Sequence, residues 1–227
     1  DERGVIEDKA CEEGYVARRT ARSLAARLRS GSGVAAETLV RQDRKIAVHL
    51  GQSDDTVFPG NRLTLVVEVS LARGLHAYGE GAHGYRPLRL VVPEDPLLLL
   101  HPPVLPATHP FRFEPLQETV PVYEGKVRIL QDVTLPDRKK LAPLLDSGEA
   151  RLDVAGTLEY QLCSRTTCYP PDRLPLRWTL RVRPPELERL RARLASRLDG
   201  EGRLVVSAQS TRDQARNAAE AGERAAE

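Results

Sequence analysis

The chain has 227 residues, of which 41% are hydrophobic and 29% charged, so it can bury a sizeable core without depending on disulfide bonds. Its formal net charge is only +2, and the basic residues are scattered among a similar number of acidic ones, which argues against a nucleic-acid partner. No apolar run approaches the roughly 18 residues of a membrane span, so we predict no transmembrane segment.

Residues 1–30 predict the end of a strand followed by a helix. Tyr15, Ala21, Leu24 and Leu28 recur at helical spacing among arginines. The stretch Ser-Gly-Ser-Gly at residues 30–33 cannot continue that helix, and we expect a linker over residues 31–43. Because the chain starts at Asp1 and contains no methionine, we also expect a fragment or a processed product.

The hydrophobic period changes to two over residues 44–183, which is typical of half-buried β-strands. The alternating apolar positions are Ile46, Val48 and Leu50; Leu63, Leu65, Val67, Val69 and Leu71; Val127, Ile129, Val133 and Leu135; Leu152, Val154, Leu158, Tyr160 and Leu162; and Leu174, Leu176, Trp178, Leu180 and Val182. Prolines separate these runs, and Asp137–Lys140 is expected to be a solvated turn. About seven short strands without helical crossovers predict a mainly β chain with an immunoglobulin-like antiparallel β-sandwich.

The C-terminal part predicts a helix and then a tail. Leu187, Leu190, Leu194 and Leu198 form one narrow apolar stripe, so we expect a helix over residues 184–200. Residues 201–227 are mostly small and polar, and we expect them to be disordered.

Two of the three cysteines, Cys163 and Cys168, are separated by four residues between two predicted strands. Directly opposed residues of an antiparallel hairpin have Cα atoms about 4.5–5.5 Å apart, within the range of about 4.4–6.8 Å that a disulfide requires. A ring this short stabilises the fold by only about 2 kcal/mol, so a purely structural role is weakly motivated.

A zinc site is less favoured than a disulfide, because zinc needs four ligands and the histidines are isolated: His49, His76, His83, His101 and His109. We therefore expect no metal and no organic cofactor. Alternation places Tyr160 and Leu162 on the buried face, so Cys163 is expected to point toward a surface that a partner thiol can reach. The third cysteine, Cys11, is expected to be a small buried hydrophobe.

The sequence YQLCSRTTCYPP, from Tyr160 to Pro171, resembles the signature around the two cysteines of the N-terminal, immunoglobulin-like domain of the thiol–disulfide interchange protein DsbD. The segment GLHAYGEGAHGYRPLRLVV, from Gly74 to Val92, is similar to the part of that domain that leads into the loops near the cysteines. Together the resemblance covers residues 44–183. This chain has four residues between its cysteines where DsbD has five.

The resemblance implies a thiol–disulfide oxidoreductase module with thioredoxin-like partners, in a periplasmic or otherwise extracytoplasmic location. Cys168 takes the place of the cysteine that forms the mixed disulfide with a partner, and Cys163 takes that of its resolving mate. The residues that could cap or flank the pair are Tyr160, Tyr169, His76, Tyr78 and Tyr85.

A second resemblance concerns the N-terminus. RGVIEDKACEEGYVARRTARSLAARL, within residues 1–30, is similar to the last strand and closing helix of a redoxin domain of the thioredoxin-like, alkyl hydroperoxide reductase and thiol-specific antioxidant kind. It implies that a redoxin domain precedes the sandwich. Two other functions stay open: a non-catalytic interaction sandwich attached to such an enzyme, with the cysteines as a clamp, and a carbohydrate- or ligand-binding sandwich.

Overall fold

The structure is a computed structural model that describes residues 18–27, 36–113, 117–145 and 148–184. The predicted helix over residues 184–200, the polar tail, Tyr15, Leu28 and Cys11 lie outside these ranges, apart from Pro184. Within the described ranges the chain is mainly β, as predicted, and forms three sheets.

The first sheet contains the long strand β5 at its centre. Its strands in spatial order are β2 (Ala36–Gln42), β3 (Ile46–Gln52), β5 (Asn61–Leu71), β11 (Lys126–Thr134) and β8 (Leu99–Leu100). The pairing is antiparallel throughout this path, with Val67 opposite Leu50 on one side and Ile129 on the other. Branched apolar side chains in these opposed positions pack on one another and fix the register.

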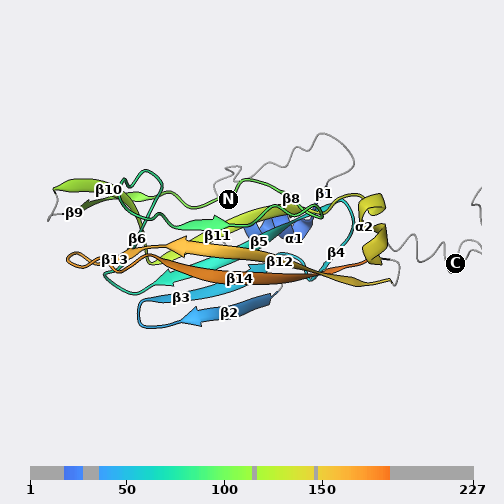
Figure 1. The fold of residues 1–227 in the computed structure, drawn as a ribbon, viewed down its shortest axis with the longest axis horizontal. Coiled ribbons are helices and arrows are strands. Elements are labelled where there is room, and N and C mark those ends of the chain that lie inside the picture. The colour runs from blue at the N-terminus through green and yellow to red at the C-terminus, as the bar shows by residue number, and fades with distance from the viewer. Residues whose placement is uncertain (1–17, 28–35, 114–116, 146–147, 185–227) are drawn as a thin grey trace, which may run out of the picture. The chain divides into compact units, whose positions relative to one another are not determined.

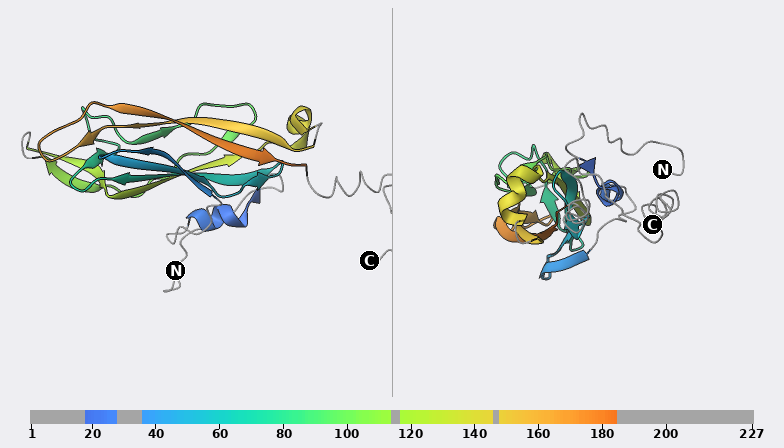
Figure 2. Two further views of the ribbon diagram at one scale, coloured as in Figure 1. Left: turned by 90° about the horizontal axis from the view of Figure 1, so that it is seen from below. Right: turned by 90° about the vertical axis from the view of Figure 1, so that its right-hand side faces the viewer.

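The second sheet lies against the first, and Figure 2 shows the two as layers. Its strands in spatial order are β4 (Thr56–Val57), β14 (Asp172–Val182), β12 (Ala150–Tyr160) and β7 (Arg89–Val91). Burial alternates strictly along most of β12 and β14, as the sequence predicts for half-buried strands. The main core between the layers includes Val48, Val67, Ile129, Leu158 and Trp178.

The third sheet lies at one end of the sandwich, at the left of Figure 1, and carries the cysteine pair. Its strands in spatial order are β13 (Leu162–Cys163), β6 (His76–Tyr78), β10 (Glu118–Glu124) and β9 (His109–Phe113). A second, smaller apolar cluster belongs to this sheet and contains Tyr78, Ala82, Val120, Val122 and Cys163.

Residues 18–27 pack on the sandwich. Strand β1 (Arg18–Arg19) pairs in parallel with the start of β5, and helix α1 (Ala21–Arg27) follows it. The predicted strand end and helix are present over these residues, with Ala21 exposed and Leu24 half-buried. Ser23 and Ala26 are buried instead, since the Ser23 hydroxyl lies 2.7 Å from Oγ1 of Thr64 on β5.

A strand and a helix lie where the sequence predicted a linker and a turn. Strand β2 falls within residues 31–43, the expected linker, and pairs with β3 across a register shift between Leu39 and Arg41. Helix α2 (Arg138–Leu145) replaces the solvated turn predicted at residues 137–140. Its start is capped by Asp137, whose carboxylate accepts a hydrogen bond from the Lys140 amide at 3.1 Å, and Leu141 is fully buried in the main core.

Candidate functional site

Cys163 and Cys168 form a disulfide at the two ends of one short loop. The sulfurs are 2.14 Å apart and the Cα atoms 4.1 Å apart, and the two residues form an isolated antiparallel bridge. The loop between them is tied internally, because the Ser164 amide donates to the Thr167 carbonyl at 2.7 Å and the Ser164 hydroxyl oxygen accepts from the Thr167 amide at 2.9 Å. The local sequence thus holds the cysteines at bonding distance, as predicted.

The two sulfur-bearing residues differ sharply in exposure. Cys163 is 0% exposed, whereas Cys168 is exposed to solvent. The prediction that Cys163 points toward an accessible surface was therefore wrong. Alternation does continue, since Leu162 packs in the main core with Tyr160 and Cys163 lies on the opposite face. That face is not open to solvent, because β13 pairs with β6 in the third sheet and the second apolar cluster covers Cys163 there.

Tyr78 contacts the sulfur of Cys168. Its hydroxyl donates to Sγ of Cys168 at 3.5 Å, and its ring stacks on Tyr85 with the centroids 4.0 Å apart. The Tyr85 hydroxyl in turn donates to the Glu118 carboxylate. Burial, together with the neighbouring Tyr85, raises the pKa of Tyr78 far above its ordinary value, so the hydroxyl beside the disulfide is a neutral donor.

His76 lies opposite the buried cysteine. It is the register partner of Cys163 in the pairing of β6 with β13, and it is 1% exposed. Its ring packs against Phe111, with centroids 4.3 Å apart, and edge-on against Tyr78 at 5.4 Å. Burial lowers the pKa of His76, so the imidazole is neutral at pH 7.

Tyr160 and Tyr169, the other two flanking candidates, pack on the main core instead of on the second cluster. The Tyr160 hydroxyl donates to Asp172 at 3.0 Å, and burial raises the pKa of Tyr160 to about 12. The Tyr169 ring lies under the ammonium group of Lys45 at 4.4 Å. The structure thus brings His76, Tyr78 and Tyr85 together around the cysteines and leaves Tyr160 and Tyr169 elsewhere.

Sequence reasoning overlooked Gln161 and Phe111 as site residues. The Gln161 side chain accepts a hydrogen bond from the Arg86 amide at 3.0 Å and donates one to the Tyr169 carbonyl at 3.2 Å. These two bonds connect the loop that contains Tyr85 with the segment that follows Cys168. Gln161 stands in the quoted cysteine signature, which was the signal for it. Phe111 could have been found only from the apolar alternation of residues 109–113.

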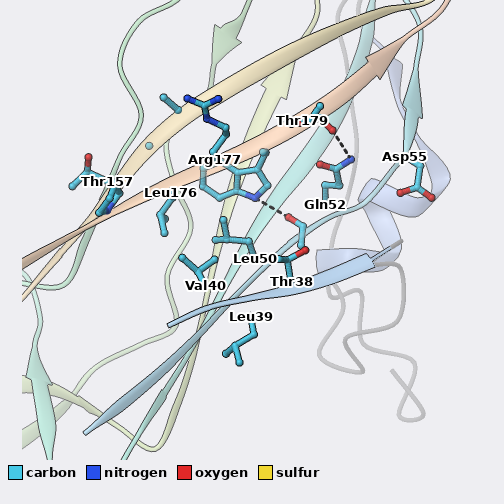
Figure 3. A pocket seen from close by; sticks show the side chains of 15 residues that line it. Thr38, Leu39, Val40, Leu50, Gln52, Asp55, Thr157, Leu176, Arg177 and Thr179 are labelled. Carbon is cyan, nitrogen blue, oxygen red and sulfur yellow. Dashed lines mark hydrogen bonds between the residues drawn. The ribbon is translucent and has the colours of Figure 1, made fainter. Parts of the chain in front are cut away.

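A separate groove of about 850 Å³ lies where β2 and β3 meet β12 and β14 (Figure 3). Leu39, Val40, Leu50 and Leu176 line it, together with polar groups that include Gln52 and Thr179. The cysteines are not among the lining residues, and the groove contains no histidine. The groove is therefore separate from the cysteine site.

The described part of the chain holds no cluster of three or more His, Cys, Asp or Glu side chains arranged to bind a metal ion. Its two helices, α1 and α2, are short, and neither has the length and apolar character of a membrane span.

Reduction of this disulfide is expected to leave the sandwich folded. The bond closes a ring of six residues, which stabilises the native state by only about 2 kcal/mol in the chain-entropy model. The main core, by contrast, contains side chains from strands of all three sheets. Far-ultraviolet circular dichroism during urea unfolding, with and without dithiothreitol, should show a midpoint shift equivalent to about 2 kcal/mol. Loss of the folded baseline on reduction alone would contradict this prediction.

Comparison with known proteins places this geometry in a family. A family model for the N-terminal domain of the thiol:disulfide interchange protein DsbD matches residues 47–175, more than half of the chain. No curated protein matches significantly.

Two of the similar solved structures are N-terminal domains. The N-terminal periplasmic domain of ScsB from Proteus mirabilis is 14% identical over 63% of this chain and 51% of that chain, with a TM-score of 0.38, so this chain spans about half of its length. The N-terminal domain of Neisseria meningitidis DsbD in the reduced form is 16% identical over 61% of this chain and 90% of that chain, with a TM-score of 0.36. On the family match, the chain belongs to the family of DsbD N-terminal thiol–disulfide interchange domains.

Proposed function

We propose that this chain passes electrons between protein thiols through Cys163 and Cys168, with Cys168 forming the mixed disulfide and Cys163 resolving it. The observation that carries the proposal is the difference in exposure between the two cysteines, since Cys168 is exposed to solvent and Cys163 is fully buried. An exchange partner must reach a sulfur in line with the bond that breaks. That requirement favours attack on Cys168 and departure of Cys163.

The step balances without a cofactor. In the reducing direction, a partner thiolate bonds to Sγ of Cys168, the Cys163–Cys168 bond breaks, and the electron pair stays on Sγ of Cys163. In the oxidising direction, the Cys168 thiolate attacks a partner disulfide and releases one partner thiolate. Cys163 then attacks Sγ of Cys168 and releases the second. Membership of the DsbD family supports thioredoxin-like partners.

We also propose an extracytoplasmic location and a redoxin fusion. The location is supported by the likeness to a ScsB domain described as periplasmic. The fusion is supported by the sequence resemblance of residues 1–30. The other predicted parts are residues 31–43, 44–183, 184–200 and 201–227, and β2 extends the sandwich into the first of these. The coding sequence upstream of Asp1 tests both: a Thr-x-x-Cys redoxin motif and a signal peptide are expected there.

Trapping with single cysteine variants tests the assignment of roles. The test uses chains that carry Cys11→Ser and a thioredoxin that keeps only its first active-site cysteine, activated as a mixed disulfide with thionitrobenzoate. The Cys163→Ala chain is expected to accumulate a mixed disulfide, because Cys168 attacks, thionitrobenzoate leaves and no resolving thiol remains on either protein. The Cys168→Ala chain should give at least about tenfold less adduct, since Cys163 is buried. Non-reducing electrophoresis and mass spectrometry measure both. More adduct with Cys168→Ala would reverse the roles.

A redox titration of the full chain in glutathione or dithiothreitol buffers separates exchange from a structural clamp. A working disulfide should have a reduction potential well above about −300 mV, the value below which structural bridges lie. A bond that stays oxidised below about −300 mV, together with no trapped partner, would reject exchange and leave the non-catalytic interaction sandwich as the function.

A further inference from the structure

A row of side chains crosses the third sheet from the buried sulfur to the protein surface. Cys163 on β13, His76 on β6 and Glu124 on β10 are directly opposed in successive strands. Directly opposed side chains lie on the same face of a sheet, with Cβ atoms about 4.5–5.5 Å apart. Cys163 and His76 are buried, whereas the Glu124 side chain is 49% exposed. One imidazole therefore stands between the buried sulfur and a solvated carboxylate.

His76 is held in this row with an unused nitrogen. Within the described residues, its Nε2 is buried and has no hydrogen-bond partner. A buried polar atom without a partner is costly and rare, and it calls for an explanation. In the oxidised protein Cys163 has no hydrogen to offer, because its sulfur is bonded to Cys168. Reduction creates a thiol on the strand directly opposite His76.

The titratable groups around His76 come from all the neighbouring strands. Glu124 on β10 raises the pKa of His76, while burial, which is the largest effect, and His109 on β9 lower it. Nε2 of His109 lies 3.3 Å from the Glu124 carboxylate. Tyr78, on the same strand as His76, carries a neutral hydroxyl, and Cys163 faces the ring from β13. The imidazole of His76 is thus uncharged and lies near the half-exposed carboxylate of Glu124.

We propose that His76 accepts the proton of the Cys163 thiol when that thiol resolves a mixed disulfide, and returns it in the reverse step. The inference rests on the exchange function proposed above and adds a residue to it. The Cys163 S–H proton passes to the imidazole, the Cys163 sulfur bonds to Sγ of Cys168, the bond from Cys168 to the partner breaks, and the partner leaves as a thiolate. The imidazolium then gives its proton to water on the Glu124 side.

The buried position of Cys163 is the reason for needing this help. A thiolate without solvent or a counter-charge is disfavoured in an apolar cluster such as the one around Cys163. Transfer of the proton to an opposed imidazole creates a thiolate and an imidazolium side by side, so no isolated charge is formed. Cysteine nucleophiles are activated by histidine in this way.

Two-step release of a coloured thiol from an aromatic disulfide tests the proposal. The full chain carrying Cys11→Ser, so that only two thiols remain, is reduced, desalted and mixed with 5,5′-dithiobis(2-nitrobenzoate) in a stopped-flow instrument. The first release of thionitrobenzoate reports attack by Cys168, and it depends on reagent concentration. The second release is intramolecular, reports attack by Cys163, and does not depend on reagent concentration.

In the chain with His76, the rate of the second release is expected to rise with pH to a plateau, with a midpoint below the ordinary histidine value of 6.5. The His76→Gln variant should release the second thiol about 100-fold more slowly near pH 7, the scale of general base catalysis, and its rate should keep rising above pH 8.5 as an unaided thiol ionises. The first release should be unchanged. His83→Gln is the matched control, because His83 is exposed in the loop after β6, and it should behave as the parent chain.

A second variant keeps the test decisive if His76→Gln does not fold. Glu124→Gln, at a half-exposed position, removes the carboxylate that raises the pKa of His76, so the midpoint of the second release should move to lower pH. A second release with the same rate and midpoint in all variants would overturn the proposal. Equal slowing of His76→Gln at every pH would also overturn it, because that result indicates packing alone. Loss of the first release in every chain would instead reject the exchange function itself.

Discussion

Replacing Trp178 by alanine is expected to destabilise the sandwich by about 3–5 kcal/mol, the range for deleting a buried large aromatic side chain. Trp178 is only 3% exposed and lies in the main core between the two layers. Its Nε1 donates to the Gly51 carbonyl on β3 at 3.0 Å, which joins β14 to the opposite sheet. The substitution removes the ring and leaves that carbonyl without its donor, so the cavity and the lost hydrogen bond add.

The Trp178 ring packs directly against Gly156 on the neighbouring strand β12. A Cβ atom at that position would lie 3.0 Å from Cζ3 of Trp178, so the glycine and the ring fit one another closely. Such a tight fit leaves little room for the surroundings to collapse into the cavity, which places the expected loss toward the upper part of the range.

Urea unfolding followed by circular dichroism measures the effect, because the variant lacks the chain's single tryptophan and its fluorescence. Leu39→Ala is the matched control. Leu39 on β2 lines the groove that Trp178 also lines (Figure 3), but it is 49% exposed, so its replacement should lower the free energy of unfolding by less than about 1 kcal/mol. A loss below about 1 kcal/mol for Trp178→Ala would contradict the central role given to this ring.

Replacing Asp132 by asparagine is expected to cost about 3 kcal/mol and to loosen residues 18–27 from the sandwich. The Asp132 carboxylate is 2% exposed and receives three guanidinium groups, from Arg19 at 2.6 Å, Arg27 at 3.1 Å and Arg62 at 3.2 Å. Thr64 donates to its other oxygen at 2.7 Å. Removing one partner of a buried ion pair typically costs about 3–5 kcal/mol, and the arginines are partly exposed, so the lower end applies.

The pH dependence has a definite sign. Burial alone would raise the pKa of Asp132, but the hydrogen bond from Thr64 and the contact with Arg19 outweigh it, so the pKa lies below its ordinary value of 3.8. A carboxyl group whose pKa is lowered by folding stabilises the protein above its unfolded pKa and loses that contribution as the pH falls through its folded pKa. The difference in unfolding free energy between the parent chain and Asp132→Asn should be full at pH 7 and shrink below about pH 4.

Unfolding in urea at pH 7 and pH 3 measures that difference, and limited proteolysis near residue 27 reports the attachment of α1. Glu80→Gln is the control, since Glu80 pairs with Arg89 at 2.6 Å but both side chains are more than half exposed, and such pairs contribute at most about 1 kcal/mol. An Asp132→Asn cost that does not exceed the Glu80→Gln cost, or that stays constant with pH, would contradict the prediction.

The sequence alone determined the positions of the long strands that bury one face in the core. Alternation along β5, β12 and β14 is a local property, because successive side chains of a strand point to opposite faces, and it located these strands with their buried residues. The spacing of Cys163 and Cys168 likewise determined their bond, since four residues suffice for one loop. The residues flanking that pair were specific enough to indicate the family.

Alternation could not say which sheet a strand joins, and that choice was left to the tertiary structure. The pattern runs on from Tyr160 to Leu162, yet β13 leaves the sheet of β12 and pairs with β6, which buries Cys163 and places it opposite His76. Strands β13 and β6 have only two and three residues, too few for a periodic signal, so the contact of Tyr78 with Cys168 depends on the long-range pairing of β6 with β10 and β13. Pairing between segments far apart in the chain is settled by packing and main-chain hydrogen bonds of the whole fold, and only these decided which of the two cysteines is buried and which is exposed.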